Sequence, residues 1–131
     1  MGAKEVSHRL RSRPKWYGGS LPHTVEILVP STKRGDVKIS PKEFKKRVRE
    51  TERFLIKEFQ GETTLPASGV YYSSKKHKFI KERIGVVEAH AKLRDISRHR
   101  AEIKAFVKRE RQKWGQESVG LVVDGRFFFG T

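Results

Sequence analysis

The residues whose types and spacing could do chemistry are two glutamates and a histidine. Glu88 and His90 stand two apart in the segment 84–91, where β-branched and nearly uncharged residues predict a strand covered on at least one face. Residues two apart on a strand share a face, and Glu26 lies on another predicted strand. If the two strands are neighbours, the three side chains could gather around Mg²⁺ or Mn²⁺ and hydrolyse a phosphodiester. Metal nucleases usually have more acidic ligands, so a hydrogen-bonded structural pair or an exposed face remains the alternative.

A second possible group is Asp95 with His99, which have the i, i+4 spacing of a helix. His99 could act as a general base, or Asp95 could cap a helix beside a surface histidine. The sequence has no cysteine, which excludes thiolate metal sites and a cysteine nucleophile. No glycine-rich phosphate loop, zinc-type histidine pair or serine nucleophile motif is present. We therefore expect no cofactor, except Mg²⁺ or Mn²⁺ in the case of a nuclease.

The charge of the chain favours a polyanionic partner. Its 131 residues include 30 Lys and Arg against 15 Asp and Glu, a net charge of +15, while 35% are hydrophobic, enough to fold. The positively charged side chains repel one another unless a polyanion or salt neutralises them, so nucleic acid, DNA or RNA, is the expected partner. The alternatives are an anionic membrane surface and a charge-rich thermophilic surface.

Three basic regions could contact phosphates. The N-terminal arm also carries Trp16 and Tyr17, which could stack on exposed bases, and a hairpin tip, residues 74–78, displays its lysines to solvent. The expected nucleic-acid-binding residues are Arg9, Arg11, Arg13, Trp16, Tyr17, Lys75, Lys76, Lys78, Arg98 and Arg100. The third region is the exposed side of the second predicted helix, which carries Arg98 and Arg100. Each region also has a structural explanation: the arm as a loose terminus, the hairpin as an edge kept soluble by lysine, and the helix side as a solvated face.

The helices and strands can be predicted from the spacing of apolar residues and from the residues that begin and end each segment. Ser40 begins a helix over residues 41–59, with Phe44, Val48, Leu55, Ile56 and Phe59 as its buried stripe and Gly61 as its stop. A second helix, capped by Asp95 or Ser97, reaches Trp114. The predicted strands are 24–30, 70–73, 84–91, 118–123 and 126–129, and residues 62–68 are predicted to be a loop.

This order predicts an α+β, ferredoxin-like βαββαβ sandwich with an extra C-terminal hairpin strand. Residues 1–22 are expected to form a flexible basic arm, and residues 23–131 a single domain. Because consecutive phenylalanines put aromatic surface on both faces of the last strand, Phe127, Phe128 and Phe129 predict a homodimer contact.

The hypothesis from sequence is a small nucleic-acid-binding protein that contacts phosphates with little sequence preference. Its alternatives are a metal-dependent nuclease of ferredoxin-like fold and a structural subunit of a ribonucleoprotein assembly. No signal peptide or membrane-spanning segment is recognisable. We expect an intracellular, cytoplasmic protein without a membrane partner.

Overall fold

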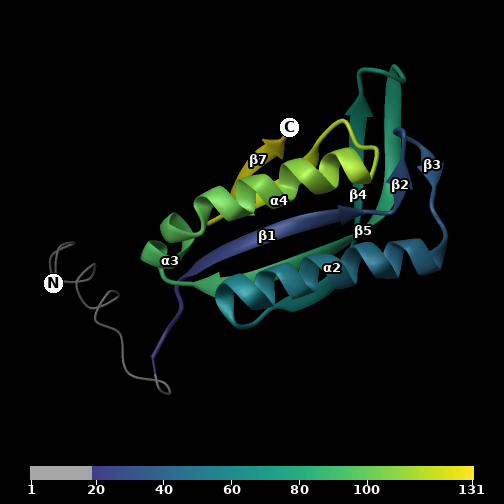
Figure 1. Cartoon of the computed structure of the whole chain (residues 1–131). Helices are drawn as coiled ribbons and strands as arrows, with labels where there is room; N and C mark the ends of the chain where they lie inside the picture. The colour runs from purple at the N-terminus through teal and green to yellow at the C-terminus, as the bar shows by residue number, and fades with distance from the viewer. Residues whose placement is uncertain (1–18) are drawn as a thin grey trace, which may run out of the picture.

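The computed structural model of the protein describes residues 19–131, so the expected contacts of Arg9, Arg11, Arg13, Trp16 and Tyr17 lie outside the described residues. The described part is an α+β fold with three helices and a five-stranded antiparallel sheet (Figure 1). The helices are α2 (Pro41–Phe59), α3 (Leu93–Arg98) and α4 (Arg100–Lys113). The strands are β1 (His23–Pro30), β2 (Thr32–Lys33), β3 (Val37–Lys38), β4 (Thr63–Ser73), β5 (Lys78–Ala91), β6 (Val119–Val123) and β7 (Arg126–Gly130).

The large sheet has the strand order β4-β5-β1-β6-β7, and β2 with β3 forms a separate two-stranded ribbon. Every neighbouring pair in the large sheet is antiparallel. The central strand is β1, and β5, which contains the predicted strand 84–91, is also an inner strand, between β4 and β1. This arrangement is compatible with the predicted ferredoxin-like class, and β7 is the added strand of the terminal hairpin.

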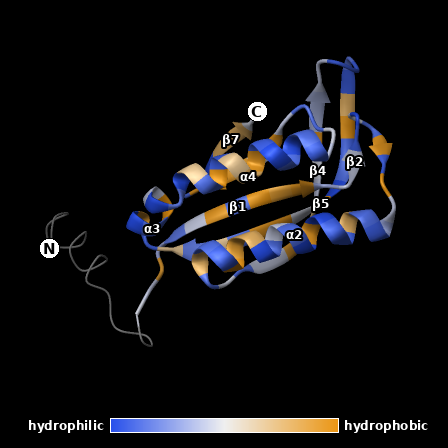
Figure 2. Ribbon diagram, in the orientation of Figure 1, coloured by the Kyte–Doolittle hydropathy of each residue, from blue (hydrophilic) through white to orange (hydrophobic). Residues whose placement is uncertain are grey.

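The core lies between the sheet and the helices α2 and α4, which cover the same face (Figure 1). Val25, Ile27 and Val29 of β1 are fully buried there, as the alternation of that strand predicts. The rings of Phe54 and Phe106 stack with centroids 4.1 Å apart, which joins the two helices over the sheet. Figure 2 shows β1 as mostly hydrophobic and the two long helices as mixed, consistent with one buried face on each helix.

The start of α2 agrees with its sequence signal. The Ser40 side chain accepts a hydrogen bond of 3.1 Å from the backbone N–H of Glu43, and Pro41 occupies the first turn. The helix ends at Phe59, as expected, but its C-cap is Gln60, which adopts a left-handed φ of 68°, and not Gly61. The buried stripe was predicted wrongly in part: Ile56 is 47% exposed, and Arg47 and Thr51 are buried instead.

Replacing Ser40 by alanine tests this cap. Ser40→Ala leaves the Glu43 N–H without its side-chain acceptor, so we expect the free energy of unfolding to fall by about 1 kcal/mol. Urea unfolding followed by circular dichroism measures this change. Ser40→Asp restores an acceptor and is the control, and equal stability of Ser40→Ala and the wild type would contradict the capping role.

The prediction for residues 62–68 was wrong. This segment is the first half of β4, whose 11 residues pair with β5 from Thr63↔Glu88 to Ser73↔Lys78. Pro66 suggested a loop because it cannot donate to a ladder, but β4 is an edge strand and its outer side needs no donor.

The second predicted helix is divided. His99, with φ −94° and ψ 8°, separates α3 from α4, and the chain enters α3 at Lys92 without a side-chain cap. Neither Asp95 nor Ser97 therefore serves as the expected cap. The Nδ1 atom of His99 pairs with Glu58 near the end of α2, and its ring meets Phe59 edge to face, so tertiary contacts hold the break.

The face of the large sheet opposite the helices is covered by none of the described helices. We call it the bare sheet face: it comprises Thr24, Glu26 and Leu28 of β1 and their register neighbours on β4, β5, β6 and β7. No helix within residues 19–131 is long and apolar enough to cross a membrane.

Candidate functional site

Glu82 is a carboxylate held in a partly buried position where β5 extends beyond β1. Thr32 of β2 donates a hydrogen bond of 2.7 Å from its Oγ1 to Glu82 Oε2, and the Ser31 backbone also bonds this carboxylate. Burial raises the pKa of Glu82, although these hydrogen bonds and the charge of Arg47 act in the opposite direction. A carboxyl group with a raised pKa in a folded setting is a common feature of reactive sites.

Tyr71 on β4 is the second perturbed group of this region. Its hydroxyl donates a hydrogen bond of 3.0 Å to the carbonyl oxygen of Gly35, between β2 and β3. Burial raises the pKa of Tyr71, and the negative charge of Glu82 raises it further. A phenol beside a negatively charged carboxylate can, together with it, bind a cation and orient a polar substrate.

Gly69 stands across the ladder from Glu82. A Cβ atom at Gly69 would have one heavy atom within 4 Å apart from its chain neighbours, Ile84 Cδ1 at 3.6 Å. No side chain from β4 therefore stands directly opposite Glu82.

Arg47 holds the segment that carries Thr32. From the buried side of α2 its Nη1 donates to the carbonyl oxygens of Pro30 at 2.9 Å and Thr32 at 2.8 Å, and its Nη2 donates to the carbonyl of Trp114 at 3.3 Å. Gln116 adds a hydrogen bond of 2.5 Å to the same Thr32 carbonyl. Burial lowers the pKa of Arg47. We call Thr32, Arg47, Tyr71, Glu82 and Gln116 the Glu82 cluster, which joins α2, the β2–β3 ribbon, the β4–β5 hairpin and the chain after α4.

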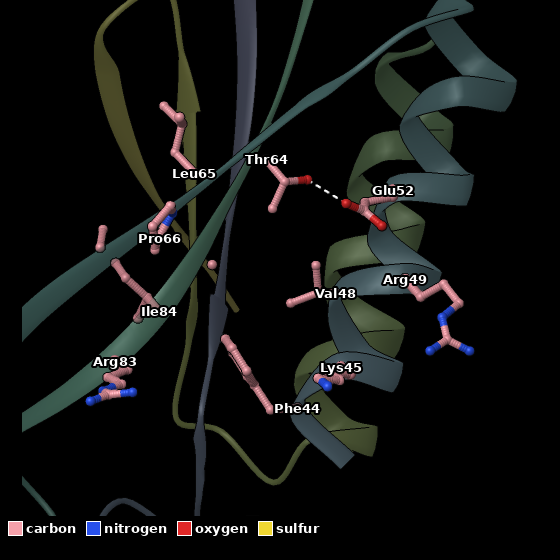
Figure 3. Close-up of a pocket in the computed structure, with 12 residues that line it drawn as sticks. Phe44, Lys45, Val48, Arg49, Glu52, Thr64, Leu65, Pro66, Arg83 and Ile84 are labelled. Carbon is pink, nitrogen blue, oxygen red and sulfur yellow. Dashed lines mark hydrogen bonds between the residues drawn. The ribbon is translucent and has the colours of Figure 1, made fainter. Parts of the chain in front are cut away.

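A separate pocket of about 480 Å³ opens between α2 and the β4–β5 edge. Figure 3 shows Phe44 and Val48 pointing from α2 toward the strands, and Thr64 donating a hydrogen bond of 2.5 Å to Glu52. Lys45, Arg49 and Arg83 supply positive charge around this opening. Its size lies within the range of small-molecule pockets.

The structure brings the predicted Glu26, Glu88 and His90 together on the bare sheet face. Glu26 and Glu88 are directly opposite in the β1–β5 register, and His90 Nε2 lies 2.9 Å from Glu88 Oε1. Burial raises the pKa of Glu26, and Glu88 raises it further. Within residues 19–131, no three acidic or histidine side chains are arranged to hold a metal ion.

The predicted phosphate-binding residues are scattered. Lys75, Lys76 and Lys78 lie in and beside the β4–β5 turn, but Lys78 and Lys76 pair with Asp36 at 2.7 and 3.6 Å. The hydrogen bond from Lys78 lowers the pKa of Asp36. Arg98 and Arg100 are exposed near the α3–α4 break, on other elements of the fold.

The analysis of the sequence missed Glu82, Tyr71 and Arg47. Glu82 stands between Lys81 and Arg83 and therefore resembles a solvated charge. A signal was present, because Glu82 occupies the alternation of Ile80, Ile84 and Val86, where an acidic residue interrupts an apolar series. Arg47 offered none, since its role depends on carbonyl groups distant in the sequence.

Comparisons with known proteins identify the fold. No family model matches the chain, and no curated protein is significantly similar to it. A phage SAM lyase in complex with S-methyl-5'-thioadenosine is similar in structure, with a TM-score of 0.61 and 14% identity over 91% of this chain and 92% of that chain. A phage SAM lyase in the apo state is also similar in structure, with a TM-score of 0.54 and 15% identity over 88% of this chain and 90% of that chain.

These similarities correct the functional hypothesis. The sequence predicted a nucleic-acid-binding protein, with a nuclease or a ribonucleoprotein subunit as alternatives, and the expected binding of DNA or RNA followed from the charge. That prediction is wrong, because the solved structures that match along nearly the whole chain are those of a phage SAM lyase. The chain shares its α+β fold with a phage SAM lyase.

Proposed function

We propose that the protein is an enzyme that binds S-adenosylmethionine and cleaves a carbon–sulfur bond, on a fold of ferredoxin-like topology. The observation that carries the proposal is the structural similarity to a SAM lyase over 91% of this chain.

The bound product of that neighbour indicates which bond would break. S-Methyl-5'-thioadenosine is what remains of S-adenosylmethionine when the aminobutyryl group leaves. In that cleavage the electron pair of the carbon–sulfur bond goes to sulfur, which changes from a sulfonium cation to a neutral thioether. The carbon that loses sulfur forms its new bond to an oxygen of the substrate's own carboxylate, which closes a lactone and requires no further reactant. A sulfonium is a good leaving group, so the protein contributes mainly by binding, orientation and a defined electrostatic environment.

We assign the binding of the substrate's positive charge to Glu82. Its ionised carboxylate is partly buried, is oriented by Thr32, and lies across the ladder from Gly69, which has no side chain. Tyr71 lies close enough for its pKa to respond to that charge, so its ring and hydroxyl belong to the same site. A cation held against a partly buried carboxylate gains more than it would in bulk water.

The proposed activity is tested with the purified full-length protein. Incubation with S-adenosylmethionine is expected to yield S-methyl-5'-thioadenosine, measured by liquid chromatography with mass spectrometry against a protein-free control. A boiled sample corrects for the slow spontaneous breakdown of the substrate. Formation of this product at the rate of the two controls would refute the proposed activity.

A further inference from the structure

We propose that a second pocket, between α4 and the hairpin of β6 and β7, binds a free single-chain carboxylate amphiphile of the fatty-acid class. This pocket of about 740 Å³ lies beside α4 and β7 (Figure 1) and shares no lining residue with the Glu82 cluster. Its size lies within the range of small-molecule sites. We call it the α4–β7 pocket. The proposal goes beyond the proposed lyase activity and stands independently of it.

The floor of the α4–β7 pocket is apolar. Ile103 and Val107 line it from α4, and Leu121 and Val123 line it from β6. Phe128 of β7 is opposite Leu121 in the register, and Leu121 packs against the core, so the Phe128 ring points to the same helix side of the sheet. This ring is 44% exposed. Aliphatic and aromatic surface is therefore open to a ligand whose body is apolar.

One end of the α4–β7 pocket is closed at Gly130. A Cβ atom at this position would collide with Val107 of α4 and would lie 2.6 Å from the carbonyl oxygen of Val119, so β7 and α4 are in direct contact there. Arg100, which precedes Val107 by about two turns of α4, also lines the pocket and is exposed. A space that is closed at one end and open at the other accommodates a single alkyl chain with its head group in water.

The charge of the α4–β7 pocket indicates an anionic head group. Arg100, Lys104 and Lys108 line it at four-residue spacing, on one side of α4, and no Asp or Glu among the described residues lines it. Within residues 19–131 these three cations form no ion pair, whereas Lys113 of the same helix pairs with Glu50 at 2.8 Å. Like charges at this spacing destabilise a helix, and a bound anion relieves their repulsion.

The scarcity of uncharged polar side chains favours an alkyl chain over a nucleoside. Among the described residues, Ser97 and Thr131 are the only ones that bring such a side chain to the α4–β7 pocket. A nucleoside base is oriented by several placed polar groups, whereas an alkyl chain needs none and gains from the apolar area that it removes from water. The positive rim also makes the pocket unsuitable for the sulfonium of the proposed lyase substrate.

The test is isothermal titration calorimetry of the full-length protein with decanoate, which is expected to bind once per chain. Lys104→Gln/Lys108→Gln removes two cations of the rim, and its dissociation constant is expected to rise by about 5-fold or more, since exposed ion contacts are individually weak. Phe128→Glu replaces the open ring by a like charge and should abolish binding. The replaced side chains are exposed, so both variants should keep their circular dichroism spectra. Decyltrimethylammonium has the same chain and the opposite charge, and it should not bind.

The matched control is Lys42→Gln/Lys46→Gln. It removes two exposed cations at the same spacing from α2, where neither lines the α4–β7 pocket, and should bind decanoate as the wild type does. A wild type that does not bind decanoate would overturn the inference. So would equal affinity of Lys104→Gln/Lys108→Gln and the wild type, or equal weakening in the two double variants.

Two further outcomes would assign the α4–β7 pocket to another occupant and contradict the inference. The first is retention of the protein on phosphatidylglycerol vesicles, lost in Lys104→Gln/Lys108→Gln, without binding of free decanoate, which would indicate a lipid head group. The second is an affinity for decanoate that falls as the protein concentration rises, which would indicate a second copy of the chain. A wild type that binds decanoate but lacks lyase activity would support this inference while the proposed function fails.

Discussion

Glu82→Gln is expected to reduce formation of S-methyl-5'-thioadenosine by about 100-fold. The substitution keeps the shape of the side chain and an oxygen that can accept the Thr32 hydrogen bond, but it removes the negative charge. A hydrogen bond to a charged group contributes about 1.5–3 kcal/mol, and each 1.36 kcal/mol corresponds to a tenfold change in rate. The loss of a single partly buried ion contact therefore accounts for a change of this size.

The same variant is expected to unfold at a higher temperature than the wild type at pH 7. Burial raises the folded-state pKa of Glu82 above its unfolded value, so the fold favours the protonated carboxyl. The stability contributed by this group is present below the unfolded pKa and is lost as pH rises through the raised folded pKa. Glutamine stays neutral at every pH, so its advantage should disappear as the solution is acidified below the ordinary range of a glutamate.

The matched control for Glu82→Gln is Glu52→Gln in the pocket of Figure 3. Glu52 is also partly buried and accepts a threonine hydrogen bond, but it belongs to the α2–β4 opening. Product formation and the melting temperature should be measured for both variants across pH. If Glu52→Gln loses the activity and Glu82→Gln retains it, the substrate site lies in that pocket, and our assignment of Glu82 is wrong.

The sequence predicted the elements whose signals are local. Ser40 located the beginning of α2, and the predicted strands 118–123 and 126–129 located the turn between β6 and β7, where Asp124 and Gly125 both adopt positive φ. Prediction failed where tertiary contacts override local preference. Pro66 is accepted because β4 lies at an edge, and the second helix breaks at His99, which contacts Glu58 and Phe59 on α2.

The functional prediction failed for a related reason. Net charge is a property of composition, and it does not show which charges are paired or buried. Lys76 and Lys78 are paired with Asp36, while Glu82, which looked like part of a solvated Lys-Glu-Arg run, is half-buried against Thr32. The proximity of Glu26, Glu88 and His90 could be anticipated from strand alternation, because they lie on adjacent strands of one face. The Glu82 cluster joins four distant segments, which no local pattern can reveal.

Arg47→Met is expected to lower the free energy of unfolding by about 2–4 kcal/mol. Two effects oppose each other at this position. Burial makes a guanidinium costly, as its lowered pKa shows, and replacing a buried charge by an apolar side chain can be neutral. However, the partners of Arg47 are backbone carbonyls that stay polar after the substitution. Unpaired buried polar groups cost about 1–3 kcal/mol each.

Gln116 limits this loss, since it also donates to the carbonyls of Thr32 and Trp114, which leaves the Pro30 carbonyl most affected. Urea unfolding of Arg47→Met should be compared with Arg49→Met, which removes an exposed guanidinium two residues along α2 and should change stability by less than about 0.5 kcal/mol. Because Arg47 positions the segment that carries Thr32, Arg47→Met should also weaken product formation through Glu82. Equal stability of the two variants would show that desolvation of the guanidinium outweighs its three carbonyl contacts.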